Sequence, residues 1–114
     1  MGEERRRFPR VPQSFAAQCR SLGGLSESWR AVRTVDLSAV GMRVRSDEPF
    51  EFWTTLEIRI QVPSLREPLD LRGRVVWSRT PPSGMTEMGI EFVDLGPEQQ
   101  EQIDELVQFL TDRE

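Results

Sequence analysis

The run Trp53-Thr54-Thr55-Leu56-Glu57-Ile58-Arg59-Ile60-Gln61-Val62 carries the clearest structural signal in this chain. From Leu56 to Val62, every second residue is aliphatic and every residue between them is polar or charged. Successive side chains of a strand point to opposite faces. The alternation therefore predicts a strand over residues 53–62 that buries one of its faces.

Weaker alternation extends from this strand in both directions. It predicts five further strands, over residues 14–20, 29–35, 40–46, 69–78 and 88–92. Segments rich in Pro, Gly, Ser and Asp separate them, as is typical of turns. In the 40–46 strand, the predicted buried face begins with Val40. In the 69–78 strand, the predicted buried face ends with Trp77, and Gly73 predicts a bulge or bend. Six short antiparallel strands at this spacing favour a closed barrel over an open sheet.

After Pro97 the apolar period lengthens from two residues to about 3.6. The stripe consists of Ile103, Leu106, Val107 and Leu110. It predicts an amphipathic helix that packs either across a barrel opening or against a second subunit, so a homodimer is compatible with the sequence. The predicted fold is all-β with a terminal helix: a six-stranded antiparallel β-barrel plus a C-terminal α-helix. Within this single domain we expect a flexible N-terminal arm at 1–13, the barrel at 14–95 and the helix at 96–114.

Composition excludes several classes of protein. The chain has no histidine and one cysteine, Cys19, so the commonest general base is missing and an internal disulfide or CxxC metal site is ruled out. We therefore expect no enzyme, no catalytic residue, no metal site and no cofactor. No apolar run approaches the ~20 residues that span a bilayer, and the charged N-terminus is unlike a signal peptide. These features predict a cytoplasmic protein without a membrane span.

The net charge of −4 is unevenly distributed along the chain. Residues 1–10 carry four Arg and two acids, residues 11–93 are neutral, and residues 94–114 carry one Arg and seven acids. A basic head on a neutral body with an acidic tail is a poor surface for DNA or RNA. It is better suited to a small anion site near the head.

Two polar stretches are candidates for such a site. One is Asp36-Leu37-Ser38-Ala39-Val40-Gly41, between two predicted strands; the other is Arg6-Arg7-Phe8-Pro9-Arg10. The simpler readings are a hairpin turn and a solvated basic tail. However, Arg binds both guanine edges and phosphate, and Asp accepts hydrogen bonds from a base. A Ser hydroxyl adds a small polar contact, and Gly lets a flat ligand approach the backbone. Together these are the groups that a guanine-containing phosphate ligand needs.

The same two stretches resemble the motifs of the PilZ domain family. Arg6–Arg10 matches its RxxxR motif, and Asp36–Gly41 matches its [DN]xSxxG motif 26 residues farther along the chain. The run Met88-Gly89-Ile90-Glu91-Phe92 is similar to the last strand of the family. The resemblance extends from about residue 4 to residue 110, nearly the whole chain.

The resemblance implies a six-stranded barrel that acts as a receptor for the bacterial second messenger cyclic di-GMP. Arg6 and Arg10 would hold guanine and phosphate groups, and Asp36, Ser38 and Gly41 would form the opposing surface on the barrel. Additional contacts would come from Arg5, Arg7 and Gly89. A lone domain of this kind implies an adaptor that changes its arm conformation and its effector-protein partner when the ligand binds.

An alternative reading is a PilZ-fold protein–protein interaction module with weak or no nucleotide binding. In that case exposed apolar groups would carry the interaction. The candidates are Phe8, Phe50, Phe52 and the outer face of the helix.

Overall fold

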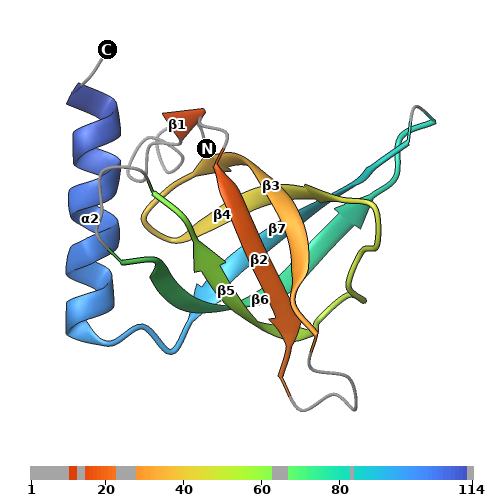
Figure 1. Cartoon of the computed structure of the whole chain (residues 1–114), viewed down its shortest axis with the longest axis horizontal. Coiled ribbons are helices and arrows are strands. Elements are labelled where there is room, and N and C mark those ends of the chain that lie inside the picture. The colour runs from red at the N-terminus through yellow and green to blue at the C-terminus, as the bar shows by residue number, and fades with distance from the viewer. Residues whose placement is uncertain (1–10, 13–14, 23–27, 63–66, 83, 113–114) are drawn as a thin grey trace, which may run out of the picture.

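An antiparallel barrel with one helix against its end makes up the structure (Figure 1). This computed structural model describes residues 11–12, 15–22, 28–62, 67–82 and 84–112. Its elements are β1 (Val11–Pro12), β2 (Ala16–Ser21), β3 (Arg30–Leu37), β4 (Gly41–Ser46), β5 (Thr55–Ile60), β6 (Leu69–Arg79), β7 (Thr86–Val93) and α2 (Pro97–Asp112).

Closure of the barrel follows from the pairing of β3 on both of its sides. The order around the barrel is β3-β2-β5-β6-β7-β4, and β4 pairs again with β3. All of these pairings are antiparallel, which confirms the predicted six-stranded barrel. The two-residue strand β1, which falls within the range predicted as an arm, adds to β3 beyond β2.

The barrel interior is filled by the predicted alternating residues. On β5, Leu56, Ile58 and Ile60 are at most 1% exposed, and on β7 Met88 and Ile90 are at most 2% exposed. Burial on β5 alternates with the predicted two-residue period, whereas on β7 the residues between the inward side chains, Glu87 and Gly89, are buried as well. Cys19 of β2 is also fully buried.

A bulge in β6 reverses one prediction. The register of β6 on β7 shifts between Val75 and Trp77, so Val76 is the extra residue. One extra residue moves the following side chains to the other face. Trp77 is therefore 38% exposed instead of continuing the inward face. At Gly73, where we predicted the bulge or bend, both ladders are in register.

A second irregularity in β3 sets the orientation of the first candidate motif. The pairing of β3 with β4 shifts between Thr34 and Asp36, which leaves Val35 unpaired in the ladder. Leu37 and Met42 then face each other inside the barrel, and Asp36 faces Arg43 on the outside. Val40, predicted to lie on the buried face, belongs to the turn and is 42% exposed.

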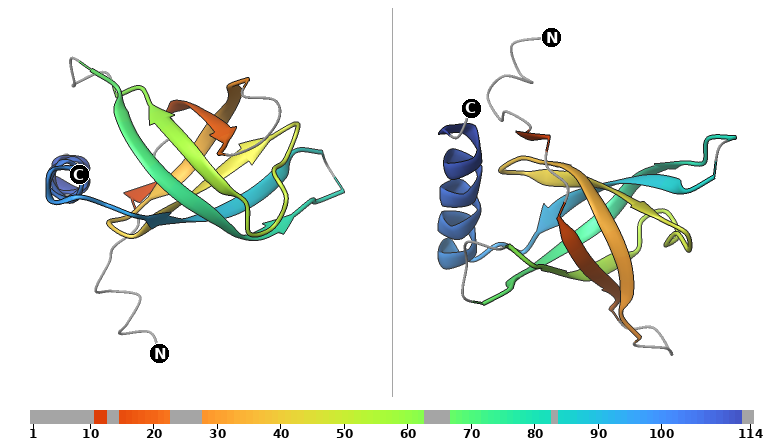
Figure 2. Two further views of the ribbon diagram at one scale, coloured as in Figure 1. Left: turned by 90° about the horizontal axis from the view of Figure 1, so that it is seen from below. Right: turned by 45° about the horizontal axis from the view of Figure 1, so that its top comes forward.

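The helix α2 covers one end of the barrel, as two further views show (Figure 2). Its predicted stripe, Ile103, Leu106, Val107 and Leu110, is buried in the same core as the strands. Packing of the stripe against its own barrel therefore holds within a single chain. Gly96 directly precedes the helix: its N–H donates to Gln99 Oε1, and Gln99 Nε2 donates to the carbonyl of Asp70 on β6. None of the helical residues described here forms a segment long and apolar enough to cross a bilayer.

Candidate functional site

The turn from β3 to β4 is held by Ser38. Its N–H donates to the carbonyl of Gly41 at 2.9 Å, and its hydroxyl donates to the same oxygen at 3.3 Å. The hydroxyl also accepts from the N–H of Val40 at 3.3 Å. Ser38 is 1% exposed. In this structure it therefore shapes the turn, which is the role that the hairpin reading gave it.

Gly41 is needed by the barrel itself. A Cβ at this position would collide with the carbonyl oxygen of Ile90 on the neighbouring strand β7. The close approach that glycine permits here is thus that of another strand.

Asp36 lies on the outer face of β3, bound by an arginine of β4. Its Oδ2 accepts from Arg43 Nε at 2.7 Å and lies 2.6 Å from Arg43 Nη2. The hydrogen bond to Asp36, with the charge of that carboxylate, raises the pKa of Arg43 above its ordinary value. The pair fixes where the carboxylate points, which is what a group that receives a base or an arginine requires.

Glu87 of β7 gathers three arginines on the same outer face. Its carboxylate lies 3.6 Å from Arg43 Nη1, 3.3 Å from Arg45 Nε and 3.2 Å from Arg79 Nη2. Its side chain is only 9% exposed, whereas those of Arg45 and Arg79 are 54% and 70% exposed. Three cations and two carboxylates leave this face with a net positive charge, which suits an anionic ligand.

An aromatic ring completes this face. The indole ring of Trp77 on β6 lies directly over Gly89 of β7. The two are so close that any Cβ at Gly89 would collide with the ring. Gly89 also pairs with Arg43 of β4. The indole, Arg43 and Asp36 thus occupy neighbouring positions across β6, β7, β4 and β3.

The structure brings only part of the predicted site together. Asp36, Ser38, Gly41 and Gly89 lie on β3, β4 and β7 and the turn between the first two. The predicted contacts Arg5, Arg6, Arg7 and Arg10 lie outside the described residues. The two residues that directly follow Arg10 pair with the motif, Val11 with Leu37 and Pro12 with Asp36. β1 therefore lies beside the first two residues of the Asp36–Gly41 motif.

Sequence analysis missed Arg43, Glu87 and Trp77 as members of this face. The alternation of the 40–46 strand placed Arg43 on its outer face, three residues after Val40. That outward Arg next to the motif was the signal that could have identified it as part of the site. Nothing in the sequence pairs Glu87 with arginines of β4 and β6, because those contacts depend on the strand order.

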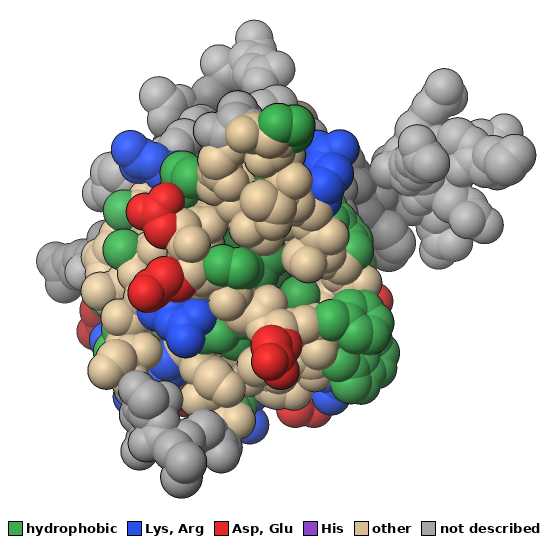
Figure 3. All heavy atoms as spheres, turned by 90° about the vertical axis from the view of Figure 1, so that its right-hand side faces the viewer, with side chains coloured by type: hydrophobic (Ala, Val, Ile, Leu, Met, Phe, Trp, Pro, Cys, Tyr) green, Lys and Arg blue, Asp and Glu red, His purple; other side chains and the backbone are tan. Residues whose placement is uncertain are grey.

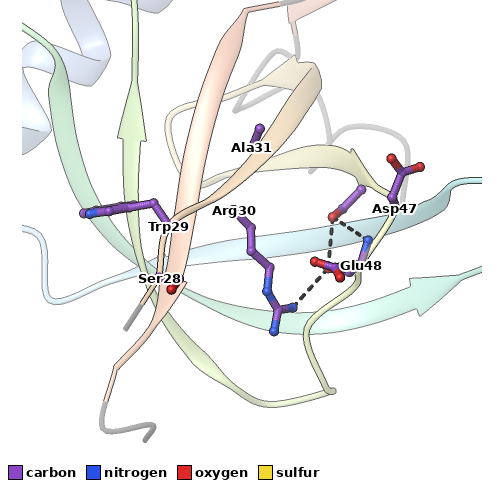
Figure 4. Close-up of a pocket in the computed structure, with 7 residues that line it drawn as sticks. Ser28, Trp29, Arg30, Ala31, Asp47 and Glu48 are labelled. Carbon is purple, nitrogen blue, oxygen red and sulfur yellow. Dashed lines mark hydrogen bonds between the residues drawn. The ribbon is translucent and has the colours of Figure 1, made fainter. Parts of the chain in front are cut away.

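A separate cleft of about 640 Å³ lies at the other end of β4. It is lined by Ser28, Trp29, Arg30, Ala31, Ser46, Asp47 and Glu48. Arg30 reaches across it from β3 and donates to the carbonyl of Glu48 (Figure 4). It also donates to the carbonyl of Pro49. In the described part of the chain, no three His, Cys, Asp or Glu side chains are placed to hold a metal ion.

Comparison with known proteins gives the family. The family model described as the PilZ domain matches residues 4–109. The chain belongs to the PilZ family. No curated protein sequence gives a significant match to this PilZ domain.

Solved structures share its fold. The PilZ domain of YcgR from Escherichia coli, solved with c-di-GMP, has a TM-score of 0.73 at 15% identity over 96% of this chain and 93% of that one. The inhibitor of motility MotI/DgrA of Bacillus subtilis has a TM-score of 0.74 at 19% identity over 96% of this chain. The PilZ domain of CeSA from a cellulose-synthesizing bacterium has a TM-score of 0.69 at 21% identity over 90% of this chain and 98% of that one. This chain spans half the length of MotI/DgrA.

Proposed function

We propose that this PilZ domain is a receptor for cyclic di-GMP that acts as an adaptor in bacterial signalling. The observation that carries the proposal is the pairing of β1 with the start of the Asp36–Gly41 motif. β1 directly follows Arg10, and its residues pair with Asp36 and Leu37. The YcgR domain that shares this fold was solved with c-di-GMP.

In the proposed complex each residue has a distinct task. Arg6 and Arg10 clamp guanine edges and phosphates, which suits the planar five-donor guanidinium. Asp36, already oriented by Arg43, receives donors from the ligand or the arm. Ser38 holds the turn by its hydrogen bond, and Gly41 lets the turn pack closely against β7. The net positive face around Glu87 attracts the phosphates.

The proposed output is a change of arm conformation and partner, with no catalysis by the chain and with action in the cytoplasm. The protein-interaction reading without ligand is less well supported because both motifs are intact. One of its candidates, Phe50, was wrong: this ring is 7% exposed and belongs to the core. Phe52 is 63% exposed, and Phe8 lies outside the described residues.

Titration calorimetry with cyclic di-GMP tests the proposal. Arg6→Ala and Arg10→Ala should each lose roughly 1–3 kcal/mol of binding free energy, because each removes charged hydrogen bonds to the ligand. The melting temperature should stay the same. Arg72→Ala, at an exposed position of β6, is the charge-matched control and should bind like wild type. Two arginine variants that titrate like wild type would refute the site.

Amide exchange tests the arm separately. If residues 1–10 close over the ligand, their amides should exchange rapidly without cyclic di-GMP and slowly with it. The amides of β5, inside the barrel ladder, should change little and serve as the internal reference. Equal protection of the arm in both states would contradict arm closure.

A further inference from the structure

Two large aromatic side chains stand in solvent on the loop between β4 and β5. Phe52 is 63% exposed and Trp53 is 56% exposed, and their ring centroids lie 5.5 Å apart. Figure 3 views the end of the barrel that carries this loop and shows hydrophobic side chains gathered at one edge. Single exposed apolar residues are ordinary, but an adjacent Phe–Trp pair is the composition of an interaction surface.

The loop that carries the pair is anchored at several points. Phe50 is buried, its N–H contacts Met88 Sδ at 3.4 Å, and the Arg30 guanidinium stacks on its ring at 4.3 Å. The N–H of Trp53 donates to the carbonyl of Val75 at 2.7 Å. The aromatic pair is therefore presented by a fixed backbone, which lowers the entropic cost of binding a partner.

Trp53 is held in a backbone conformation that its side chain disfavours. Its φ is 73°, in the left-handed region that non-glycine residues disfavour. Its ring lies 4.9 Å from the guanidinium carbon of Arg74. Arg74 Nε is buried and lacks a hydrogen-bond partner in the structure. The fold thus tolerates strain and an unsatisfied donor around an exposed ring.

The charges around the pair select the kind of partner. Asp47, Glu48 and Glu51 of the same loop are exposed, and none of them forms an ion pair with another residue of the described ranges. Two nearby cations lie against rings of this loop: the Arg30 guanidinium, which also lines the cleft beside Asp47 and Glu48, stacks on Phe50, and the Arg74 guanidinium lies against Trp53. A ligand approaching from solvent meets carboxylates beside aromatic rings. Such a surface complements Arg or Lys flanked by apolar side chains.

We propose that the loop of residues 47–53 docks a segment of a partner protein that carries Arg or Lys beside apolar residues. This inference rests on the proposed adaptor function, for which it supplies the partner-binding surface. The loop and the Asp36–Gly41 motif lie at opposite ends of β4, so ligand and partner can be bound together.

Three synthetic peptides of equal length test the proposal on the full chain by ¹H–¹⁵N correlation spectra. One contains Arg and Leu, one Arg and Ser, and one Glu and Leu. The Arg–Leu peptide should shift the amides of residues 47–53, and the Arg–Ser peptide should bind about tenfold more weakly. Shifts elsewhere, no shifts, or equal binding of the Glu–Leu peptide would overturn the proposal.

Two variants separate the aromatic and the charge contributions. Trp53→Gly removes the ring but suits the positive φ, so the loop keeps its shape; it should weaken the Arg–Leu peptide about tenfold. Asp47→Arg with Glu51→Arg should weaken it at least as much. The control, Glu101→Arg with Glu105→Arg on α2, changes the net charge equally at exposed positions and should have no effect. An equal loss in the control would show general charge attraction and would overturn the proposal.

Cyclic di-GMP titration of the same variants keeps the two ideas apart. Trp53→Gly and the loop charge reversal should bind the nucleotide like wild type. If the peptide binds but cyclic di-GMP does not, the receptor proposal alone is refuted. If cyclic di-GMP binds and the loop variants do not change peptide binding, the docking proposal alone is refuted.

Discussion

At the scale of single residues, Glu87 holds the outer face of the barrel together. Its buried carboxylate is shared by arginines of β4 and β6, and one of these, Arg43, orients Asp36. Glu87→Gln keeps the shape and removes the charge, which leaves three guanidinium groups without their common anion. We expect a loss of about 1–3 kcal/mol in the free energy of unfolding, measured by urea denaturation.

Arg79→Gln is the comparison for that variant. Arg79 is 70% exposed and contributes only one of the three contacts, so its loss should cost less than about 1 kcal/mol. If Glu87→Gln were as stable as wild type, or no less stable than Arg79→Gln, the carboxylate would not be the centre of the network.

At the scale of elements, α2 is a structural part of the barrel. Ile103 is fully buried, and the other residues of its stripe are at most 8% exposed. Ile103→Ala should therefore lower the free energy of unfolding by about 2–5 kcal/mol, through lost burial and a cavity. Deletion of residues 97–114 should destabilise the barrel further, because the barrel end that the stripe covers would face water.

Thermal melting together with light scattering measures both effects. Gln102→Ala, exposed on the same helix, should melt within a few degrees of wild type. Since the stripe packs on its own chain, Ile103→Ala should leave the mass of the folded protein unchanged. A melting temperature that the deletion does not alter would mean that the stripe contributes little.

At the scale of the whole molecule, the free energy of unfolding at alkaline pH should depend on the ionisation of one side chain. The chain has no Lys, Tyr or His, so apart from the terminal amine only Cys19 titrates between pH 8 and 12. Burial raises the pKa of Cys19 from 9.0 to about 12. Above pH 9 the unfolded chain loses this proton while the folded chain keeps it. The stability is therefore complete below pH 9 and falls towards pH 12, by up to about 1.4 kcal/mol per pH unit.

Urea denaturation under reducing conditions at several pH values from 8 to 11 measures this slope. At pH 8 Cys19→Ala should be less stable than wild type, because it leaves a small cavity, but its stability should stay level between pH 9 and 11. The same fall with pH in Cys19→Ala would show that another group is responsible.

The sequence by itself determined the features that repeat along the chain. The alternation of Leu56, Ile58 and Ile60 defined a strand, and the stripe from Ile103 to Leu110 defined the helix. The motif Asp36–Gly41 pointed to the β3–β4 turn. These features are local, since a strand or helix shows its buried face as a period in its own residues.

Only the tertiary structure decided what depends on neighbouring strands. A bulge at Val76 turned Trp77 outward, and the shift at Val35 put Asp36 opposite Arg43. Strand order brought Glu87 to arginines of two other strands, and the loop fold buried Phe50 while exposing Phe52. Each outcome is set by contacts between residues far apart in the chain. A period of two cannot reveal them, because one extra residue in a ladder reverses every face that follows.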